Sequence, residues 1–400
     1  MEEYGRIILK SGKDQSLMRY HPWVFSGAIK KTKGHFQEGD VVRVYNNKDE
    51  FLALGHYQPG TIAVRVFSFT DQTIDHAYWR NKINRALDLR KRLGLWNQNH
   101  TNVFRLVNAE GDGMPGLIID YYHGTAVIQT HSVGMYRLLD PLVDILQELL
   151  GDQLQAIYNK SASSLPHKAE VEREEGYLWG EASYDTVSEH GLSFRVNWEE
   201  GQKTGFYVDQ RENRQLVRHY AREAEVLNLF GYTGGFSVYA AAGGCKRVVS
   251  VDSSQKATEL ADQNMKLNFG DSVDHVATAQ DAFEYLRQSD ERFDLMILDP
   301  PAFAKHYNVL PNAIQGYKKL NRLAIQKIRS GGIIFTFSCS QVMSRENFRK
   351  MAFTAAANTG RKVRILGQMT QPPDHPVDIY HPRSEEHTCE LQSLSHISYA

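Results

Sequence analysis

The sequence predicts an α/β protein whose carboxyl-terminal half is built on a mostly parallel sheet. From residue 191 to about 380, short apolar runs of strand length alternate with helical segments, which is the pattern of βαβ units. Three of these runs are followed by an acid, and in such sheets ligands bind beyond the carboxyl ends of the strands. These acids are Asp252, Asp281 and Asp299.

The stretch 226–252 contains the most informative unit of this sheet. It predicts a buried strand, a tight glycine turn at 231–235, a short helix, and a second strand that ends at Asp252. The turn has the spacing G-x-x-G-G, and it lacks the G-x-G start that pyrophosphate-binding turns use. S-adenosylmethionine, which carries no phosphate, therefore fits this turn better than a dinucleotide. A purely structural glycine turn stays open as an alternative.

The length of 400 residues suits two or three domains. Short strand-like runs separated by turns predict a small β-barrel at 1–72, and a mixture of helix and strand patterns predicts a central α/β domain at 73–190. The sheet domain follows at 191–382. The chain has no apolar run of membrane-span length and no signal-like start, and its three cysteines form neither a disulfide framework nor a metal pattern. We expect a cytoplasmic protein without a membrane partner or a bound metal.

The charge is balanced overall but unevenly distributed. With 46 basic and 47 acidic residues the net charge is −1, which is no global signature of nucleic-acid binding. Between Arg80 and Arg105, however, there are seven basic residues and one acid, Asp88. Such a run is either a solvated helix face or a surface that contacts phosphates, and the sequence leaves both interpretations open.

Two motifs at predicted strand ends indicate the chemistry. Asp299 begins an Asp-Pro-Pro segment, so that two prolines hold the acid on a stiff loop beside the ligand crevice. Cys339 follows the next strand, where its thiolate could add to the electron-poor carbon 6 of a pyrimidine. A lone cysteine is more often a small buried hydrophobic residue. We expect that role for Cys245, which lies far from the strand ends.

The segment 202–211, with the sequence QKTGFYVDQR, precedes the glycine-turn unit. It is polar, contains a glycine and two aromatic residues, and leads into a predicted helix. We expect Lys203, Phe206 and Asp209 to close over the methionine end of the cofactor. The alternative is that Asp209 only caps the helix.

Five motifs in this order resemble the bacterial large-subunit ribosomal-RNA methyltransferase I family, and the resemblance covers residues 1 to about 380. They are KTGFYVDQR, NLFGYTGGFSVYAA, VVSVDSSQKA, LDPPAFAK and TFSCS. The resemblance implies a PUA barrel, a central α/β domain and a Rossmann-like class I methyltransferase domain. It implies methylation of carbon 5 of a cytosine in 23S ribosomal RNA by S-adenosylmethionine.

The same resemblance implies roles for individual residues. Cys339 would be the nucleophile, and Asp299 would contact the target base. The cofactor pocket would add to Lys203, Phe206 and Asp209 the residues Asn228, Phe230, Tyr232, Gly234, Asp252, Ser253, Asp281 and Asp299.

Two other functions stay open, as does the oligomeric state. An Asp-Pro-Pro followed by an aromatic residue also suits methylation of an exocyclic amine, which needs no cysteine. A catalytically idle RNA-binding factor in ribosome assembly could keep the same fold. Cys339 argues against the first of these functions, and the intact set of cofactor acids argues against the second.

The tail at 383–400 departs from the family. Where the family has its last strand, this chain has RSEEHTCELQS, which resembles an in-frame translation of a common sequencing adapter with one difference at Cys389. We predict that this tail is not native. The last strand of the methyltransferase sheet would then be missing, and the edge of a neighbouring strand would be unpaired.

Overall fold

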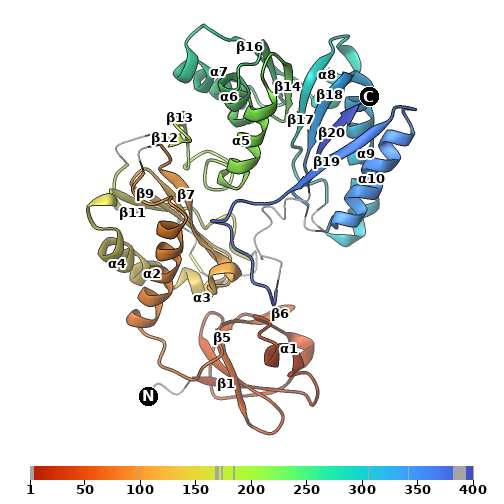
Figure 1. Ribbon diagram of the computed structural model, residues 1–400. Coiled ribbons are helices and arrows are strands. Elements are labelled where there is room, and N and C mark those ends of the chain that lie inside the picture. Colours follow the sequence, from red (N-terminus) through yellow and green to blue (C-terminus); the bar gives the residue numbers. More distant parts are fainter. Residues whose placement is uncertain are drawn as a thin grey trace. The chain divides into compact units, whose positions relative to one another are not determined.

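The computed structural model describes residues 4–98, 100–166, 171–172, 174–182, 185–304, 306–340, 342–381 and 393–399, the last stretch by its backbone alone. The described residues form two compact units (Figure 1). The first unit draws on 1–185, 196–206 and 373–386, and the second draws on 186–195, 207–372 and 387–400.

The first unit begins with the expected small barrel. Its strands pair in the order β2-β6-β5-β4-β1-β3, with β1 and β4 parallel. Alternate residues such as Val42, Val44 and Val64 point inward and are fully buried. This period of two residues is typical of a strand with one side in the core and the other in solvent. The strands are β1 (Gly5–Leu9), β2 (Trp23–Phe25), β3 (Ile29–Lys33), β4 (Val41–Tyr45), β5 (Phe51–Tyr57) and β6 (Ile62–Ser68), with a one-turn helix, α1 (Gln15–Met18).

The same unit contains the central α/β domain, whose strands pair in the order β11-β10-β9-β8-β7. The helices α2 and α4 lie side by side on one face of this sheet, where Ile83 and Ile145 pack against Ile119 (Figure 1). The strands are β7 (Val103–Asn108), β8 (Leu117–Tyr122), β9 (Thr125–Thr130), β10 (Ala156–Asn159) and β11 (Gly176–Gly180). The helices are α2 (His76–Arg92), α3 (Val133–Tyr136) and α4 (Leu139–Leu150).

The amphipathic pattern over residues 135–150 predicts one helix, but the structure has two, α3 and α4. Pro141 lies in the first turn of α4, where its missing N–H is not needed. The same proline cannot donate to residue 137, so a continuous helix through this point would lose a hydrogen bond. The chain therefore ends α3 and begins a new helix at Leu139.

Two segments expected in the sheet domain belong to the first unit, and buried polar contacts hold them there. Asp374 accepts a hydrogen bond from the backbone N–H of Arg105 at 3.0 Å, and its carbonyl accepts one from Arg90 at 2.7 Å. A Cβ on Gly111 would lie 1.8 Å from the carbonyl oxygen of Pro376, so only glycine allows this close approach. The ammonium group of Lys160 donates to the backbone carbonyls of 198, 199 and 201.

The second unit is a doubly wound sheet in the order β16-β15-β14-β17-β18-β20-β19. Neighbours from β16 to β18 are parallel, whereas β20 is antiparallel to β18 and β19. The strands are β14 (Glu225–Leu229), β15 (Arg247–Asp252), β16 (Asp274–Ala279), β17 (Phe293–Leu298), β18 (Ile328–Thr336), β19 (Val363–Met369) and β20 (Ser393–Tyr399). A hairpin of β12 (Thr186–Glu189) and β13 (Leu192–Arg195) lies beside α7.

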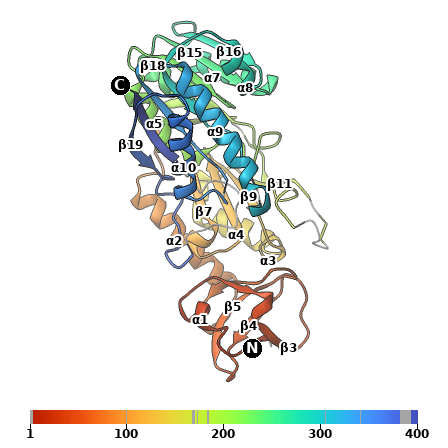
Figure 2. The ribbon, with the colours of Figure 1, turned by 90° about the vertical axis from the view of Figure 1, so that its right-hand side faces the viewer.

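Helices cover both faces of this sheet, as the βαβ pattern predicts. Leu227, Val249 and Met296 face α8, α9 and α10, while their neighbours Val226 and Val248 face α5 and α6. Figure 2 shows α9 and α10 side by side over the first of these faces. The helices are α5 (Arg211–Tyr220), α6 (Gly235–Ala242), α7 (Gln255–Phe269), α8 (Ala282–Gln288), α9 (Leu310–Lys327) and α10 (Arg345–Ala357).

The expected gap in this sheet is filled, so the prediction of a missing last strand is wrong. Residues of the tail form β20, which pairs between β18 and β19. Backbone N–H and C=O groups make the ladder bonds, so an edge can recruit a strand of unrelated sequence. The adapter-like residues before β20 lie outside the described residues, and their foreign origin stays a prediction. Among the described residues, none of the helices combines the length and the apolar character that crossing a membrane requires.

Candidate active site

The site lies at the carboxyl ends of the strands of the second unit, where the strand order reverses between β14 and β17. This reversal is the place where doubly wound sheets bind ligands. Asp299 follows β17 directly, and Cys339 follows β18 by three residues. The structure brings these two side chains together, with the Cys339 sulfur 4.0 Å from Oδ1 of Asp299. Both side chains are partly exposed.

Buried groups hold the two loops that carry this pair. The hydroxyl of Tyr317, on α9, accepts a hydrogen bond from the backbone N–H of Phe303 at 3.5 Å. Burial raises the pKa of Tyr317 to about 12, so this hydroxyl stays protonated at neutral pH. Ser340 donates to the carbonyl of Ala304 at 2.5 Å and thereby ties the cysteine loop to the Asp-Pro-Pro loop. Sequence analysis gave no role to Tyr317, because α9 lacks a motif.

The glycine turn has the strained backbone that often marks a ligand site. Phe230 and Tyr232 have positive φ values of 61° and 43°, which are uncommon for residues with large side chains. Gly234 has a φ of 75°, and a Cβ there would lie 2.8 Å from the Cβ of Ala261. The close packing of the turn against α7 therefore requires glycine at this position.

Asp252 stands beside this turn with acceptor capacity to spare. Its Oδ2 accepts from the N–H of Tyr232 at 3.0 Å, and its Oδ1 accepts from the N–H of Ser254 at 2.9 Å. These bonds fix the carboxylate and leave each oxygen a second lone pair. That arrangement fits a pair of ribose hydroxyls. Ser253, next in the chain, is exposed.

Asp209 supplies a second acid that fits the cofactor. The residue is 5% exposed, and its Oδ2 is buried without a hydrogen-bond partner among the described residues. A buried carboxylate oxygen of this kind is costly unless a donor reaches it. The α-ammonium group of S-adenosylmethionine is a donor of the right charge, and the assignment of Asp209 to the methionine end of the cofactor stays a prediction.

A buried ion pair keeps this segment in place. Arg214 donates to both carboxylate oxygens of Glu189 at 2.8 and 2.7 Å, and a third donor reaches the carbonyl of Tyr207 at 2.9 Å. The ring of Tyr207 meets the ring of Tyr232 edge-on at 5.4 Å. Arg214 and Glu189 therefore connect the segment before α5 to the glycine turn. The sequence showed both charges but not their pairing, because 25 positions separate them.

Two other predicted cofactor residues, Asn228 and Asp281, use their side chains in hydrogen bonds within the fold. Asn228 is fully buried and donates to Ser237 of α6 at 2.9 Å, so it supports the turn from inside the fold. Asp281 caps α8 by accepting from the N–H of Glu284 at 2.9 Å. Lys203 and Phe206 belong to the first unit, and their contact with the cofactor stays a prediction.

Only some of the basic side chains between Arg80 and Arg105 are exposed at the surface. Arg90 is fully buried, and it makes a bidentate ion pair with Asp112 at 2.6 and 2.8 Å. Arg105 is buried against Asp120, and Lys82 donates to two backbone carbonyls at 2.9 Å. Burial lowers the pKa of Lys82 to about 8. Neither interpretation, a phosphate-contacting surface or a solvated helix face, therefore holds for the whole run, since Lys82 and Arg90 of α2 and Arg105 of β7 point inward.

Of the two cysteines that the described residues include, Cys245 has the expected packing role. It lies against the apolar cluster between α6 and the sheet. Burial raises the pKa of its thiol to about 11. A thiol of this kind is almost entirely protonated at neutral pH and is a poor nucleophile.

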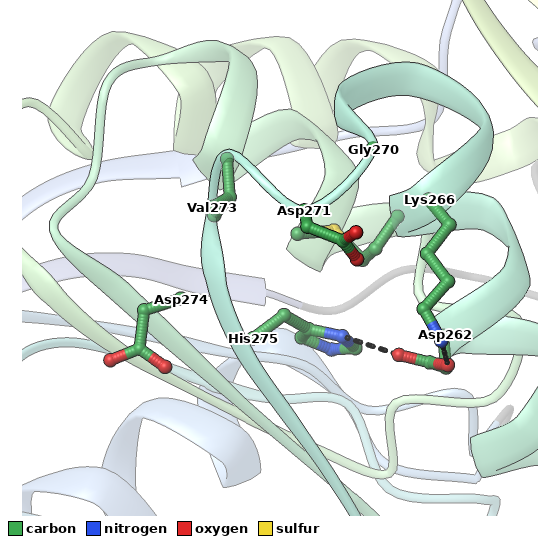
Figure 3. Close-up of a pocket in the computed structure, with 8 residues that line it drawn as sticks. Asp262, Lys266, Gly270, Asp271, Val273, Asp274 and His275 are labelled. Carbon is green, nitrogen blue, oxygen red and sulfur yellow. Dashed lines mark ion pairs between the residues drawn. The ribbon is translucent and has the colours of Figure 1, made fainter.

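A shallow pocket opens on the second unit, but at the opposite ends of the strands. It lies between α7 and the start of β16, and Figure 3 shows Asp262 between Lys266 and His275. Asp262 is 2.7 Å from the Lys266 ammonium and 3.6 Å from Nδ1 of His275. These charges neutralise one another, and the pocket has no part in the site of Cys339.

Comparison with known proteins agrees with this architecture. A family model described as S-adenosylmethionine-dependent methyltransferase matches residues 114–379, and a PUA-like domain model matches residues 7–69. A candidate SAM-dependent methyltransferase from Streptococcus mutans superimposes with a TM-score of 0.82 at 23% identity, over 99% of this chain and all of that one. A methyltransferase-like structure, SMU.776 complexed with SAH, gives the same values. These structures confirm the fold.

The curated relatives are more similar in sequence. Ribosomal RNA large subunit methyltransferase I of Alteromonas mediterranea is 39% identical over 379 residues, covering 93% of this chain and 94% of the relative. The protein of the same name from Escherichia coli strain SMS-3-5 is 37% identical over 384 residues, covering 94% and 96%. The matched segments include the glycine turn, Asp299 and Cys339. The chain is therefore a SAM-dependent methyltransferase with a PUA-like domain, and it belongs to the ribosomal RNA large subunit methyltransferase I family.

Proposed function

We propose that this enzyme methylates carbon 5 of a cytosine in 23S ribosomal RNA through a covalent adduct between Cys339 and carbon 6. Its family acts on large-subunit ribosomal RNA by name, and a bacterial ribosome is a cytoplasmic substrate. The observation that carries the finer proposal is the contact of 4.0 Å between Cys339 and Asp299 at the carboxyl edge of the sheet. Methylation of an exocyclic amine needs no such thiol.

The chemistry of cytosine explains why both side chains are needed. Carbon 5 is a weak nucleophile until a group adds to carbon 6 and pushes electrons into the ring. The Cys339 thiolate forms that bond, and the displaced electron pair moves toward nitrogen 3. Asp299 in its protonated form donates a proton to nitrogen 3 and stabilises the adduct.

Resolution of the adduct restores the enzyme. S-adenosylmethionine, when bound, would supply to carbon 5 an electrophilic methyl group from its sulfonium, which would become a neutral thioether. Carbon 5 then carries both a methyl group and a proton, and a base removes the proton. The electrons of that C–H bond re-form the double bond between carbons 5 and 6, the bond from Cys339 to carbon 6 breaks, and nitrogen 3 returns its proton to Asp299. The net change replaces one proton with one methyl group.

RNA carrying 5-fluorocytosine at the target position tests this mechanism. Fluorine at carbon 5 cannot leave as a proton does, so the methylated adduct should stay on the enzyme and resist denaturing electrophoresis. Cys339→Ala should abolish both trapping and turnover, while S-adenosylmethionine affinity changes by less than about twofold. Cys245→Ala is the matched control and should trap RNA like the unmodified enzyme, because Cys245 lies just before the amino end of β15 and not at the carboxyl edge of the sheet.

The outcomes separate the three candidate functions. Retained methylation in Cys339→Ala would exclude the adduct and favour methylation of an amine. No turnover in either form, together with RNA binding, would favour an idle assembly factor.

The substrate base must also leave its stack to reach Cys339, at a cost of about a few kcal/mol. Unstructured RNA fragments containing the target are therefore the better first substrates.

A further inference from the structure

Gln210 makes a contact with Asp299 that the proposed mechanism does not use. The residue lies at the amino end of α5 and is 2% exposed. Its side-chain amide donates from Nε2 to Oδ2 of Asp299 at 3.2 Å. We infer that Gln210 is a positioning residue that fixes the orientation of Asp299, with Oδ1 toward Cys339; this inference rests on the proposed function.

A second amide determines which end of Gln210 faces the acid. Asn213, one turn further along α5 and 3% exposed, donates from Nδ2 to Oε1 of Gln210 at 2.8 Å. Because Oε1 is held by this donor, the NH₂ group of Gln210 is the end that points toward Asp299. The two amides therefore act as a relay of donors, from Asn213 to Gln210 to Asp299.

The relay distinguishes the two oxygens of Asp299. Oδ2 accepts a hydrogen bond from Gln210, whereas Oδ1 is the oxygen that faces the Cys339 sulfur. The bond from Gln210 to Oδ2 therefore holds the carboxyl group with Oδ1 toward the sulfur. The base must lie on the side of Oδ1 for the sulfur to reach carbon 6. Gln210 thus presents Oδ1 of Asp299 to the base.

A packing role for Gln210 predicts different behaviour. Packing depends on volume, so a residue of the same shape would preserve it. The positioning role depends on an N–H donor at one end of the side chain. Glutamate has the shape of glutamine without the donor, and methionine has a similar volume without any donor or strong acceptor.

The experiment compares Gln210→Glu and Gln210→Met with Asn213→Asp in the full-length enzyme. Asn213→Asp replaces a donor by an acceptor, so the Gln210 amide should turn its Oε1 toward Asp299 although Asp299 itself is unchanged. We expect all three variants to lose about 10- to 100-fold in kcat, the range for a hydrogen bond to an ionisable group. KM for RNA and S-adenosylmethionine affinity should stay within about twofold. Gln326→Met, at an exposed position of α9, is the matched control and should retain full activity.

Two results would overturn this inference without touching the proposed function. Full kcat in Gln210→Glu would show that shape alone matters at this position. A fall in cofactor affinity equal to the fall in kcat would assign Gln210 to the cofactor pocket beside Asp209. In both cases the unmodified enzyme would still be trapped by 5-fluorocytosine RNA. Absence of trapping in the unmodified enzyme would instead remove the proposed function itself.

Discussion

The first unit and the carboxyl edge of the sheet in the second unit hold their charged groups in different ways. In the first unit, Arg90 and Arg105 are enclosed with Asp112 and Asp120, and each pair makes two hydrogen bonds. In the second unit, the acids at the carboxyl edge of the sheet accept from backbone and amide groups. Asp209, in the segment before α5, keeps a buried carboxylate oxygen without a hydrogen-bond partner among the described residues.

This difference separates charges that hold the fold from charges that can take a ligand. A buried cation that meets its own carboxylate has no capacity left for a substrate, and its removal leaves an uncompensated charge. An acid fixed by backbone donors alone, as Asp252 is, keeps its negative charge and its spare lone pairs. Such an acid is stabilised in place and still able to bind a hydroxyl or an ammonium group. Substitutions of these two kinds of charged residue should therefore have effects of different size on stability and binding.

The largest effect is expected for Arg90→Ala. The substitution leaves Asp112 buried without its cation and removes the donor to the carbonyl of Asp374, so the free energy of unfolding should fall by about 3–5 kcal/mol. Urea denaturation followed by circular dichroism measures this change. Lys91→Ala, the next residue on the exposed face of α2, should change it by less than about 0.5 kcal/mol. Equal stability of the two variants would contradict the interpretation that Arg90 and Asp112 form a buried ion pair that stabilises the fold.

An intermediate effect is expected for Asp252→Ala, measured as S-adenosylmethionine binding by calorimetry. Loss of hydrogen bonds from ribose hydroxyls to a charged group should weaken binding by about 1.5–3 kcal/mol. Asp262→Ala provides the control, because Asp262 already pairs with Lys266 and lies at the amino end of β16. An unchanged affinity in Asp252→Ala would remove Asp252 from the cofactor site.

The smallest effect on stability is expected where the basic run is exposed. Lys91→Glu with Arg92→Glu should change the free energy of unfolding by less than about 1 kcal/mol. If these cations contact RNA phosphates, the double variant should also flatten the salt dependence of RNA binding by roughly two counterions. An unchanged slope in filter-binding titrations would identify this face as merely solvated. Arg90 has to be left intact in this test, because it belongs to the core.

In the second unit, the sequence alone predicted correctly those elements that depend on residues close together in the chain. The strand over 293–298, the helix after the glycine turn and the acid at the end of β15 occur as predicted. The apolar period and the position of glycine act over a few residues, so the sequence is sufficient to predict them. The motifs also predicted the family and the cofactor class. The placement of Cys339 beside Asp299 followed from a general rule, because the carboxyl ends of neighbouring parallel strands meet at one edge.

Tertiary structure decided the properties that depend on partners far apart in the chain. Whether Arg90 is a surface cation or a core cation depends on Asp112 and on a carbonyl 284 positions away. The role of Gln210 as a donor to Asp299 depends on a contact across 89 positions. Composition and periodicity describe each residue with its neighbours in sequence. Burial and hydrogen-bond capacity belong to the folded arrangement, because desolvation makes each buried charge or amide depend on the group that faces it.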